Sequence, residues 1–207
     1  MSSPKERFDE EYYMDGVRKR KSLYEEFSWK PEVSFPIANT VKELYPNRRI
    51  LDYGCAKGYI TYALRLLNIE AYGFDTSSYA LSDCKKEVKE YLYSKKEDLP
   101  FVDLIFIKDV LEHFEYETID EELKWIQNNC KEAFIIVPLG KDEKYRIHEY
   151  SFDRTHIIIE DEEWWSKKFI DAGFVIDKFH HDLKGLKGDW IEHNPYGNGF
   201  FQLLQVD

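Results

Sequence analysis

The sequence predicts an α/β fold in which helices cover both faces of a seven-stranded, mostly parallel sheet. Short apolar segments of strand length alternate with amphipathic segments of helix length through most of the chain. Some of the apolar segments are almost continuous, which is typical of strands buried on both faces. A glycine-containing turn follows the first of them. Such alternation indicates parallel strands joined by helical crossovers.

The predicted elements form one globular domain behind a helical arm. The arm occupies residues 1–45, Pro46 separates it from the first strand, and residues 46–207 form the domain. A length of 207 residues suits one domain with a full hydrophobic core. Strands are predicted near 49–53, 70–75, 90–94, 102–108, 132–138, 174–181 and 198–206, and helices near 58–68, 78–88, 117–129 and 160–172.

The turn after the first strand contains Gly54 and Gly58 and leads into an amphipathic helix. Glycine allows a ligand to approach the backbone closely, and the helix N-terminus adds unpaired N–H donors. Asp52 ends the preceding strand, and its carboxylate would repel a pyrophosphate. We therefore expect a ligand that carries an ammonium or a sulfonium group.

The run from Leu51 to Gly58, LDYGCAKG, resembles the first motif of class I S-adenosylmethionine-dependent methyltransferases. The resemblance implies a Rossmann-like sheet whose last strand, here Gly199 to Val206, inserts antiparallel. The dinucleotide fingerprint G-x-G-x-x-G fails, because Ala56 and Tyr59 stand at its later glycine positions. The resemblance implies cofactor contacts from Asp52, Gly54, Cys55, Ala56 and Gly58, with Ala56 as a small substitute for the usual middle glycine.

A second apolar strand ends in Asp75. In dinucleotide-binding folds an acid at the second strand end binds ribose hydroxyls. Asp75, followed by Thr76, is therefore expected to bind the adenosine ribose of the cofactor. The alternative interpretation is that Asp75 caps the helix that follows, since aspartate is also favoured there.

The strand from Val102 is followed by the sequence DVLEH, Asp109 to His113, which resembles the fourth motif of small-molecule methyltransferases. The resemblance implies that Lys108 and Asp109 lie beside the methyl donor and that His113 covers the pocket. For His113 a structural role, with the ring bonded to a neighbouring carbonyl, remains an alternative.

The adenine contact departs from the family pattern. Related sequences carry an acid about five residues before a Leu-Pro-Phe tripeptide, but Ser94 stands at that place here. The nearest acids are Glu97 and Asp98. We expect Asp98, Leu99 or backbone groups nearby to contact the adenine.

Substrate chemistry is expected after the fifth strand, because ligands bind beyond the carboxyl ends of strands in such sheets. His156 is the predicted general base, since the ordinary pKa of histidine suits removal of a hydroxyl proton. Asp153 or Glu149 would orient it. The alternative is that His156 only ties its loop to a backbone carbonyl.

Two segments resemble methyltransferases of bacterial surface-sugar pathways: Phe8 to Gly16 in the arm, and the run DRTH that ends at His156. The arm and the last loop are expected to close over a substrate, through aromatic and polar side chains suited to a sugar ring. Tyr12 and Tyr13 packing on the sheet edge is the alternative for the arm. The predicted substrate-binding residues are Tyr13, Trp164, Trp190, His193 and Tyr196.

No metal site is expected from the sequence. His180, His181, Glu192 and His193 suggest one superficially, but adjacent residues on a strand point to opposite faces. The three cysteines form no C-x-x-C pair, so neither a disulfide framework nor a structural zinc site is indicated.

Composition restricts the partners. With 29 Lys and Arg against 40 Asp and Glu, the net charge is −11, which disfavours nucleic acid. No apolar run is long enough to span a bilayer, and the start lacks a signal-peptide pattern, so a cytoplasmic location is expected.

Together these observations predict an S-adenosylmethionine-dependent methyltransferase that acts on an oxygen or nitrogen of a small polar acceptor such as a sugar or glycan precursor. A protein methyltransferase and a catalytically silent binding subunit are the alternatives. The oligomeric state is left open.

Overall fold

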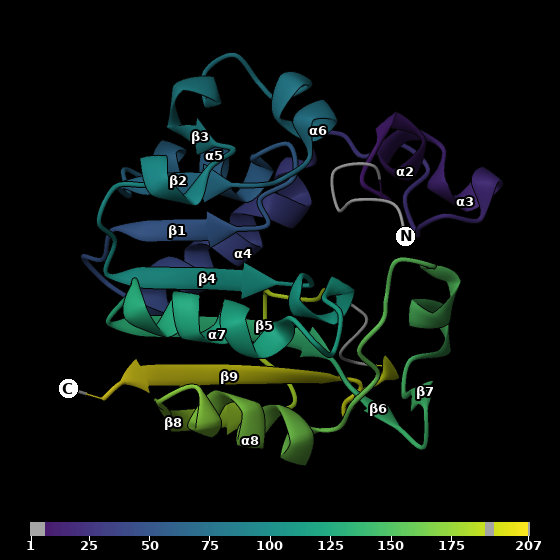
Figure 1. Cartoon of the computed structure of the whole chain (residues 1–207). Helices are drawn as coiled ribbons and strands as arrows, with labels where there is room; N and C mark the ends of the chain where they lie inside the picture. Colours follow the sequence, from purple (N-terminus) through teal and green to yellow (C-terminus); the bar gives the residue numbers. More distant parts are fainter. Residues whose placement is uncertain (1–6, 189–192, 207) are drawn as a thin grey trace. The chain divides into compact units, whose positions relative to one another are not determined.

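The computed structural model describes residues 7–188 and 193–206. Its main sheet has seven strands in the order β3-β2-β1-β4-β5-β9-β8, and the seven-stranded Rossmann-like sheet that the sequence predicts is confirmed (Figure 1). The chain divides into two compact units. Unit 1 contains Met1–Pro100 and Phe152–Thr155, and unit 2 contains Phe101–Ser151 and His156–Asp207. Each unit is described by itself below.

Unit 1 contains the first three strands of the sequence. They are parallel, with Asp52 opposite Gly73 across β1 and β2, and Gly73 opposite Leu92 across β2 and β3. The elements are α2 (Glu10–Met14), α3 (Gly16–Lys19), α4 (Pro31–Leu44), β1 (Ile50–Tyr53), α5 (Tyr59–Leu66), β2 (Ala71–Phe74), α6 (Ser78–Ser82), η1 (Lys89–Tyr91), β3 (Leu92–Tyr93) and η2 (Lys96–Asp98).

The N-terminal arm packs within unit 1 through aromatic rings. Tyr12 and Tyr13 are both 4% exposed and form a buried cluster with Ala80 of α6. Rings from Phe8, Tyr24, Phe27 and Tyr79 pack against this cluster. The Ser77 hydroxyl also donates to the Phe8 carbonyl at 2.6 Å. Apolar burial and this hydrogen bond attach the arm to the segment after β2.

Unit 2 contains the remaining four strands of the main sheet. β4 and β5 are parallel, and β9 lies between β5 and β8 and runs antiparallel to both. The predicted antiparallel last strand is therefore confirmed. The elements are β4 (Leu104–Lys108), η3 (Leu111–His113), α7 (Ile119–Asn128), β5 (Glu132–Pro138), β6 (Gly140–Lys141), β7 (Lys144–Tyr145), η4 (His148–Phe152), α8 (Glu162–Asp171), β8 (Phe174–His180) and β9 (Asn198–Gln205).

The core of unit 2 follows from the apolar runs of its strands. Phe106 and Phe134 sit opposite each other on β4 and β5, and their ring centroids are 5.6 Å apart. Trp165 and Phe169 of α8 are fully buried, and Phe169 contacts Phe201 of β9. Packed aromatic side chains therefore hold β4 and β5, and with them the carboxyl ends of these strands, in place.

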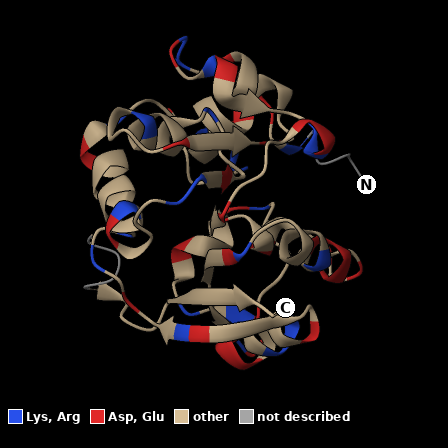
Figure 2. Ribbon diagram, turned by 90° about the vertical axis from the view of Figure 1, so that its left-hand side faces the viewer, with Lys and Arg blue, Asp and Glu red and all other residues tan. Residues whose placement is uncertain are grey.

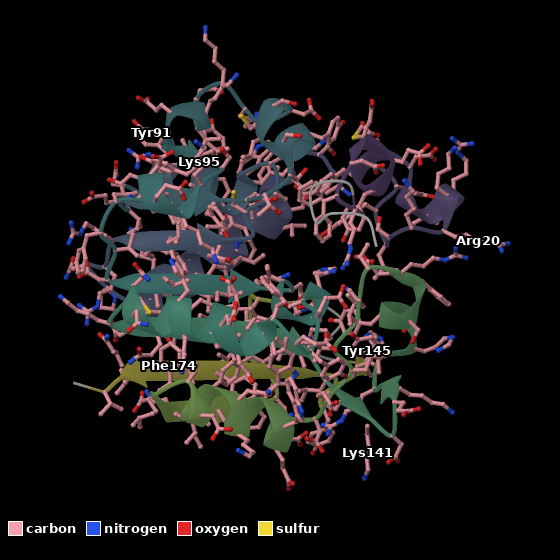
Figure 3. All side chains as sticks on the ribbon, viewed as in Figure 1. Arg20, Tyr91, Lys95, Lys141, Tyr145 and Phe174 are labelled. Atoms are coloured by element: carbon pink, nitrogen blue, oxygen red, sulfur yellow. The ribbon has the colours of Figure 1, made fainter. Side chains whose placement is uncertain are left out.

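Two predicted elements are shorter in the structure than the sequence suggested. The helix expected over 78–88 ends at Ser82, because the chain turns there and Asp83 forms an ion pair of 2.7 Å with the buried ammonium of Lys57. The strand expected over 90–94 contains only Leu92–Tyr93, after a 3₁₀ turn. A small hairpin, β6 and β7, adds structure to the segment after β5; its exposed Lys141 and buried Tyr145 are labelled in Figure 3.

Charged residues of both signs lie mainly on helices and loops, while the strands consist mainly of uncharged residues (Figure 2). None of the helices in the described part of the chain is both long and apolar enough to cross a membrane.

Candidate active site

The glycine turn after β1 contains three residues in the left-handed backbone conformation. Gly54, Ala56 and Gly58 have φ values of 76°, 51° and 70°, all in the left-handed region. The Gly54 and Cys55 amides donate to the Phe74 carbonyl at 2.8 and 3.0 Å, which ties the turn to the end of β2. Gly58 is the N-cap of α5. The turn thus presents backbone groups at a helix N-terminus.

Asp75 holds the same turn from the second strand end. One carboxylate oxygen accepts the Ala56 amide at 2.7 Å, and the other accepts the Ser77 amide at 2.7 Å. Burial raises the pKa of Asp75, although these amides and that of the half-buried Thr76 oppose the effect. A carboxylate has about four lone-pair positions, so both oxygens can still accept ligand hydroxyls. The Ser77 hydroxyl, rather than Asp75, caps α6 by accepting the Ala80 amide.

Asp52 and Cys55 are buried beside the turn. The Asp52 Oδ2 accepts the amide and the hydroxyl of Thr61 at 3.1 and 2.8 Å, so it fixes the first turn of α5. Burial raises the pKa of the Cys55 thiol well above its usual value. A direct contact of Asp52 with a cationic ligand stays a prediction.

The two residues expected near an adenine lie around η2. Asp98 ends this 3₁₀ turn and is exposed, whereas Leu99 is half-buried and its amide donates to the Lys96 carbonyl at 3.3 Å. The Lys96 ammonium lies 5.5 Å from the ring centroid of Tyr53. An adenine contact from this segment stays a prediction.

In unit 2 the carboxyl end of β4 carries a network of charges. Asp109 has a φ of 57° and pairs with Lys108 at 2.6 Å and with Lys187. The Lys187 ammonium also donates to the Tyr150 hydroxyl at 2.9 Å, which in turn donates to Asn198 Oδ1 at 2.7 Å. Burial by itself would raise the pKa of Asp109, but the two ammonium groups outweigh it and hold that pKa below its usual range.

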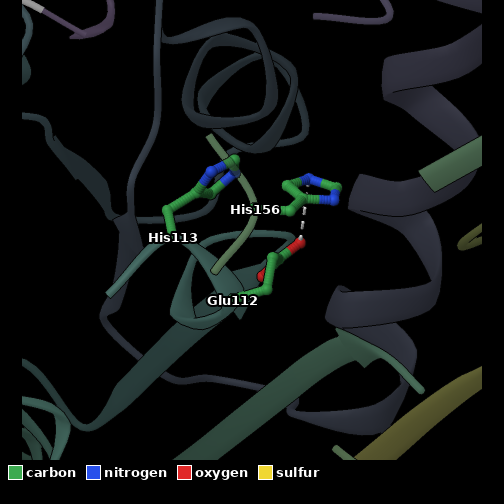
Figure 4. Close-up of side chains that lie close together, drawn as sticks. All are labelled: Glu112, His113 and His156. Atoms are coloured by element: carbon green, nitrogen blue, oxygen red, sulfur yellow. Dashed lines mark ion pairs between the residues drawn. The ribbon is translucent and has the colours of Figure 1, made fainter. Parts of the chain in front are cut away.

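Directly after this network, η3 places Glu112 and His113 near His156 (Figure 4). Glu112 Oε1 is 3.9 Å from His156 Nε2, and the ring centroids of His113 and His156 are 4.7 Å apart. The Glu112 side chain is fully buried and that of His156 is 6% exposed. Burial, followed by the charge of Asp109, raises the pKa of Glu112 well above its usual value.

Asp153, expected to orient His156, bonds Tyr12 and Thr155 of unit 1. Its carboxylate accepts the Tyr12 hydroxyl at 2.9 Å, and the Thr155 amide and hydroxyl at 2.9 and 2.6 Å. The carboxylate of Glu112, which was not expected to take this role, lies 3.9 Å from His156. Glu149 is exposed on η4. An orienting role for Asp153 stays a prediction.

The expected substrate-binding residues occupy different surroundings. Tyr13 is buried in the arm cluster. Trp164 is half-buried on α8 and meets the ring of Tyr116 edge-on at 5.8 Å. Tyr196 is 65% exposed and packs against His181, and His193 is exposed. Trp190 lies outside the described residues.

Sequence reasoning missed two charged groups of this region. Glu112 belongs to the DVLEH run, and its position beside a histidine was the available signal. Lys187 lies in the last loop and carries no motif that would have pointed to Asp109.

Comparison with known proteins identifies a relationship for most of the chain. Residues 28–178 match the family described as the methyltransferase domain. No curated protein sequence matches the chain.

Several solved structures share the fold at low sequence identity. A SAM-dependent methyltransferase from Archaeoglobus fulgidus is 18% identical with a TM-score of 0.62, over 82% of this chain and 93% of that one. The magnesium protoporphyrin IX methyltransferase of Synechocystis with bound SAM is 15% identical with a TM-score of 0.56, over 82% and 76%. The CcbJ methyltransferase from Streptomyces caelestis is 10% identical with a TM-score of 0.62, over 86% and 91%.

Proposed function

The chain belongs to the methyltransferase domain family, and on this premise we propose that it transfers a methyl group from S-adenosylmethionine to an oxygen or nitrogen of a small polar acceptor, such as a sugar or glycan precursor. The observation that carries the cofactor assignment is the left-handed glycine turn held by Asp75. A protein substrate and a silent binding subunit are the alternatives that the experiments below distinguish.

The residues of the turn fit this cofactor. Each oxygen of Asp75 accepts one backbone amide, and the remaining lone pairs suit the two ribose hydroxyls of an adenosine. Glycine at position 58 keeps the turn in this shape, because its φ is positive and a Cβ there would lie 2.8 Å from a methyl of Leu92. S-adenosylmethionine supplies an activated methyl on a sulfonium. The protein then has to hold an acceptor in line with that methyl and to exclude water.

The polar groups beyond β4 support a small polar acceptor. Parallel α/β sheets bind ligands outside the carboxyl ends of their strands, and Lys108 and Asp109 occupy that end of β4. We propose that His156, through its imidazole, receives the proton of the acceptor, and that the adjacent Glu112 keeps that ring in place. A cytoplasmic location and the closure of the arm over a substrate stay predictions.

Cofactor binding is tested by titration calorimetry with S-adenosylmethionine and its demethylated product. Asp75→Asn should weaken binding by about 1–3 kcal/mol, since the site loses a charged hydrogen-bond acceptor. Asp120→Asn, at an exposed position on α7, is the matched control and should bind as the wild type does. A folded Asp75→Asn protein with unchanged affinity would contradict the ribose assignment.

The acceptor is tested with labelled cofactor and panels of sugars, other small polar molecules and peptides. Turnover of a sugar or another small polar molecule supports the proposal. Turnover of peptides alone would identify a protein methyltransferase. Retention of the cofactor without turnover in any panel would identify a binding subunit.

His156→Ala should lower turnover by about a hundredfold or more and leave cofactor affinity unchanged, as expected for loss of a general base. His148→Ala, at an exposed histidine on η4, is the control. Near-normal turnover by the His156 variant would leave this residue a structural role.

A further inference from the structure

Glu112 is a buried carboxylate that no surrounding group satisfies by a hydrogen bond within the described residues. Its side chain is fully buried. Burial of an unsatisfied carboxyl group costs free energy unless another group compensates it. A compensating ligand is therefore expected at this position.

Two imidazoles border the same carboxylate. Ligand atoms of Glu112, His113 and His156 all lie within 4.8 Å of one another, and the separation between Glu112 Oε1 and His156 Nε2 is 3.9 Å. Two ligands that bind one ion at about 2.1 Å each lie about 3.4 Å apart in tetrahedral geometry and at most about 4.2 Å apart. Small side-chain rotations would bring the three atoms into this range. Figure 4 shows the three side chains close together, before any such rotation.

The backbone holds the three residues in place. The amides of Ile157 and Ile158, directly after His156, donate to the Glu112 carbonyl at 2.7 and 3.0 Å. The Tyr145 hydroxyl donates to the Ile158 carbonyl at 2.8 Å, so the β6–β7 hairpin supports the same segment. Ligands fixed by their own backbone lose little entropy when they bind an ion, which favours a preorganised site.

We propose that Glu112, His113 and His156 form a binding site for a divalent transition-metal ion. Two imidazole nitrogens and one carboxylate suit zinc, iron, cobalt or manganese, whereas magnesium and calcium favour sites made of oxygen ligands. The nearby ammonium groups of Lys108 and Lys187 are both paired with Asp109. Three protein ligands leave coordination positions for an oxygen of water or of an acceptor.

A metal ion bound here would change how the acceptor loses its proton during methyl transfer. This consequence rests on the proposed function. Nε2 of His156 cannot both bind an ion and accept a proton. In the metal-loaded protein an acceptor hydroxyl bound to the ion would have a lowered pKa and would release its proton to solvent water, leaving an alkoxide to attack the methyl group. His156 would then act as a ligand, and His156→Ala would lower turnover in either case.

The test is cobalt binding by the purified full chain after treatment with a chelator. We expect one equivalent of Co²⁺ to bind the wild type and to give visible absorption bands of nitrogen and oxygen coordination. His113→Asn and Glu112→Gln should each weaken binding at least tenfold. His148→Asn, at an exposed histidine outside the cluster, should bind cobalt as the wild type does.

Circular dichroism and cofactor affinity establish that each variant is folded, and Zn²⁺ provides a second measurement. Saturating Zn²⁺ should raise the melting temperature of the wild type and of His148→Asn, but not that of His113→Asn. Absence of stoichiometric binding by the wild type, or equal affinities in wild type and His113→Asn, would overturn the site. Metal binding without methyl transfer to any acceptor would instead count against the proposed function alone.

Discussion

Removal of the Tyr12 hydroxyl measures how much one hydrogen bond contributes to attaching the arm to the segment before His156. This hydroxyl donates to Asp153 Oδ2 at 2.9 Å in a buried position, while the ring packs on Phe8, Tyr13 and Tyr24. Tyr12→Phe keeps this ring packing and removes only the hydrogen bond. A hydrogen bond to a charged group contributes about 1.5–3 kcal/mol. Because Thr155 also donates to Asp153, we expect a loss near 2 kcal/mol.

Urea denaturation followed by tryptophan fluorescence gives the free energy of unfolding for this comparison. Tyr72→Phe is the matched control, because its hydroxyl donates to a carboxylate oxygen of Glu70 at 2.8 Å in an exposed position. The control should lose no more than about 0.5 kcal/mol. If Tyr12→Phe were as stable as Tyr72→Phe, the bond to Asp153 would not hold the arm, and the reasoning would be refuted.

Two further predictions concern charge and backbone conformation. Lys187→Met should destabilise the protein by about 1–3 kcal/mol at neutral pH, because Asp109 loses one of its paired ammonium groups. Pairing with the two ammonium groups lowers the pKa of Asp109 in the folded protein. The ionised Asp109 therefore stabilises the fold above a pH of about 4, and this stabilisation is lost as the pH falls further. Denaturation curves of Lys187→Met and wild type should therefore converge in acid. Ala56→Gly should leave the free energy of unfolding unchanged or raise it by up to about 1 kcal/mol, since glycine adopts the left-handed backbone of this position without strain. Gly58→Ala should instead destabilise the protein, because its Cβ would meet Leu92. Thermal melting compares the two, and a destabilised Ala56→Gly or a stable Gly58→Ala would contradict the interpretation.

The positions of the strands along the chain could be predicted from the sequence because apolar periodicity and strand ends are local properties. β4 and β5 read as almost continuous apolar runs, and the structure buries them as expected. The end of α6 could not be predicted in this way. Its position depends on Asp83 reaching the buried Lys57, a contact between residues far apart in sequence.

The same distinction applies to the candidate site. The turn from Gly54 to Gly58 and the acid at Asp75 are encoded in short motifs, and the structure joins them through the Ala56 amide. The neighbours of His156 are set by tertiary structure. No spacing in the sequence indicates that Asp153 bonds Tyr12 or that Glu112 faces His156.

The placement of Phe152–Thr155 in unit 1 has a consequence for synthesis on the ribosome. Unit 1 draws these residues from a point well after Pro100, so the nascent chain cannot complete it until residue 155 has emerged. Until then Tyr12 lacks its acceptor on Asp153, and the Lys21 carbonyl lacks the Arg154 amide. The aromatic cluster of the arm can form once α6 has emerged, so we expect the arm to dock in two stages and to gain its last hydrogen bonds only with residues 152–155. A protease added to stalled chains of increasing length should cut the arm more slowly once residue 155 has left the ribosome.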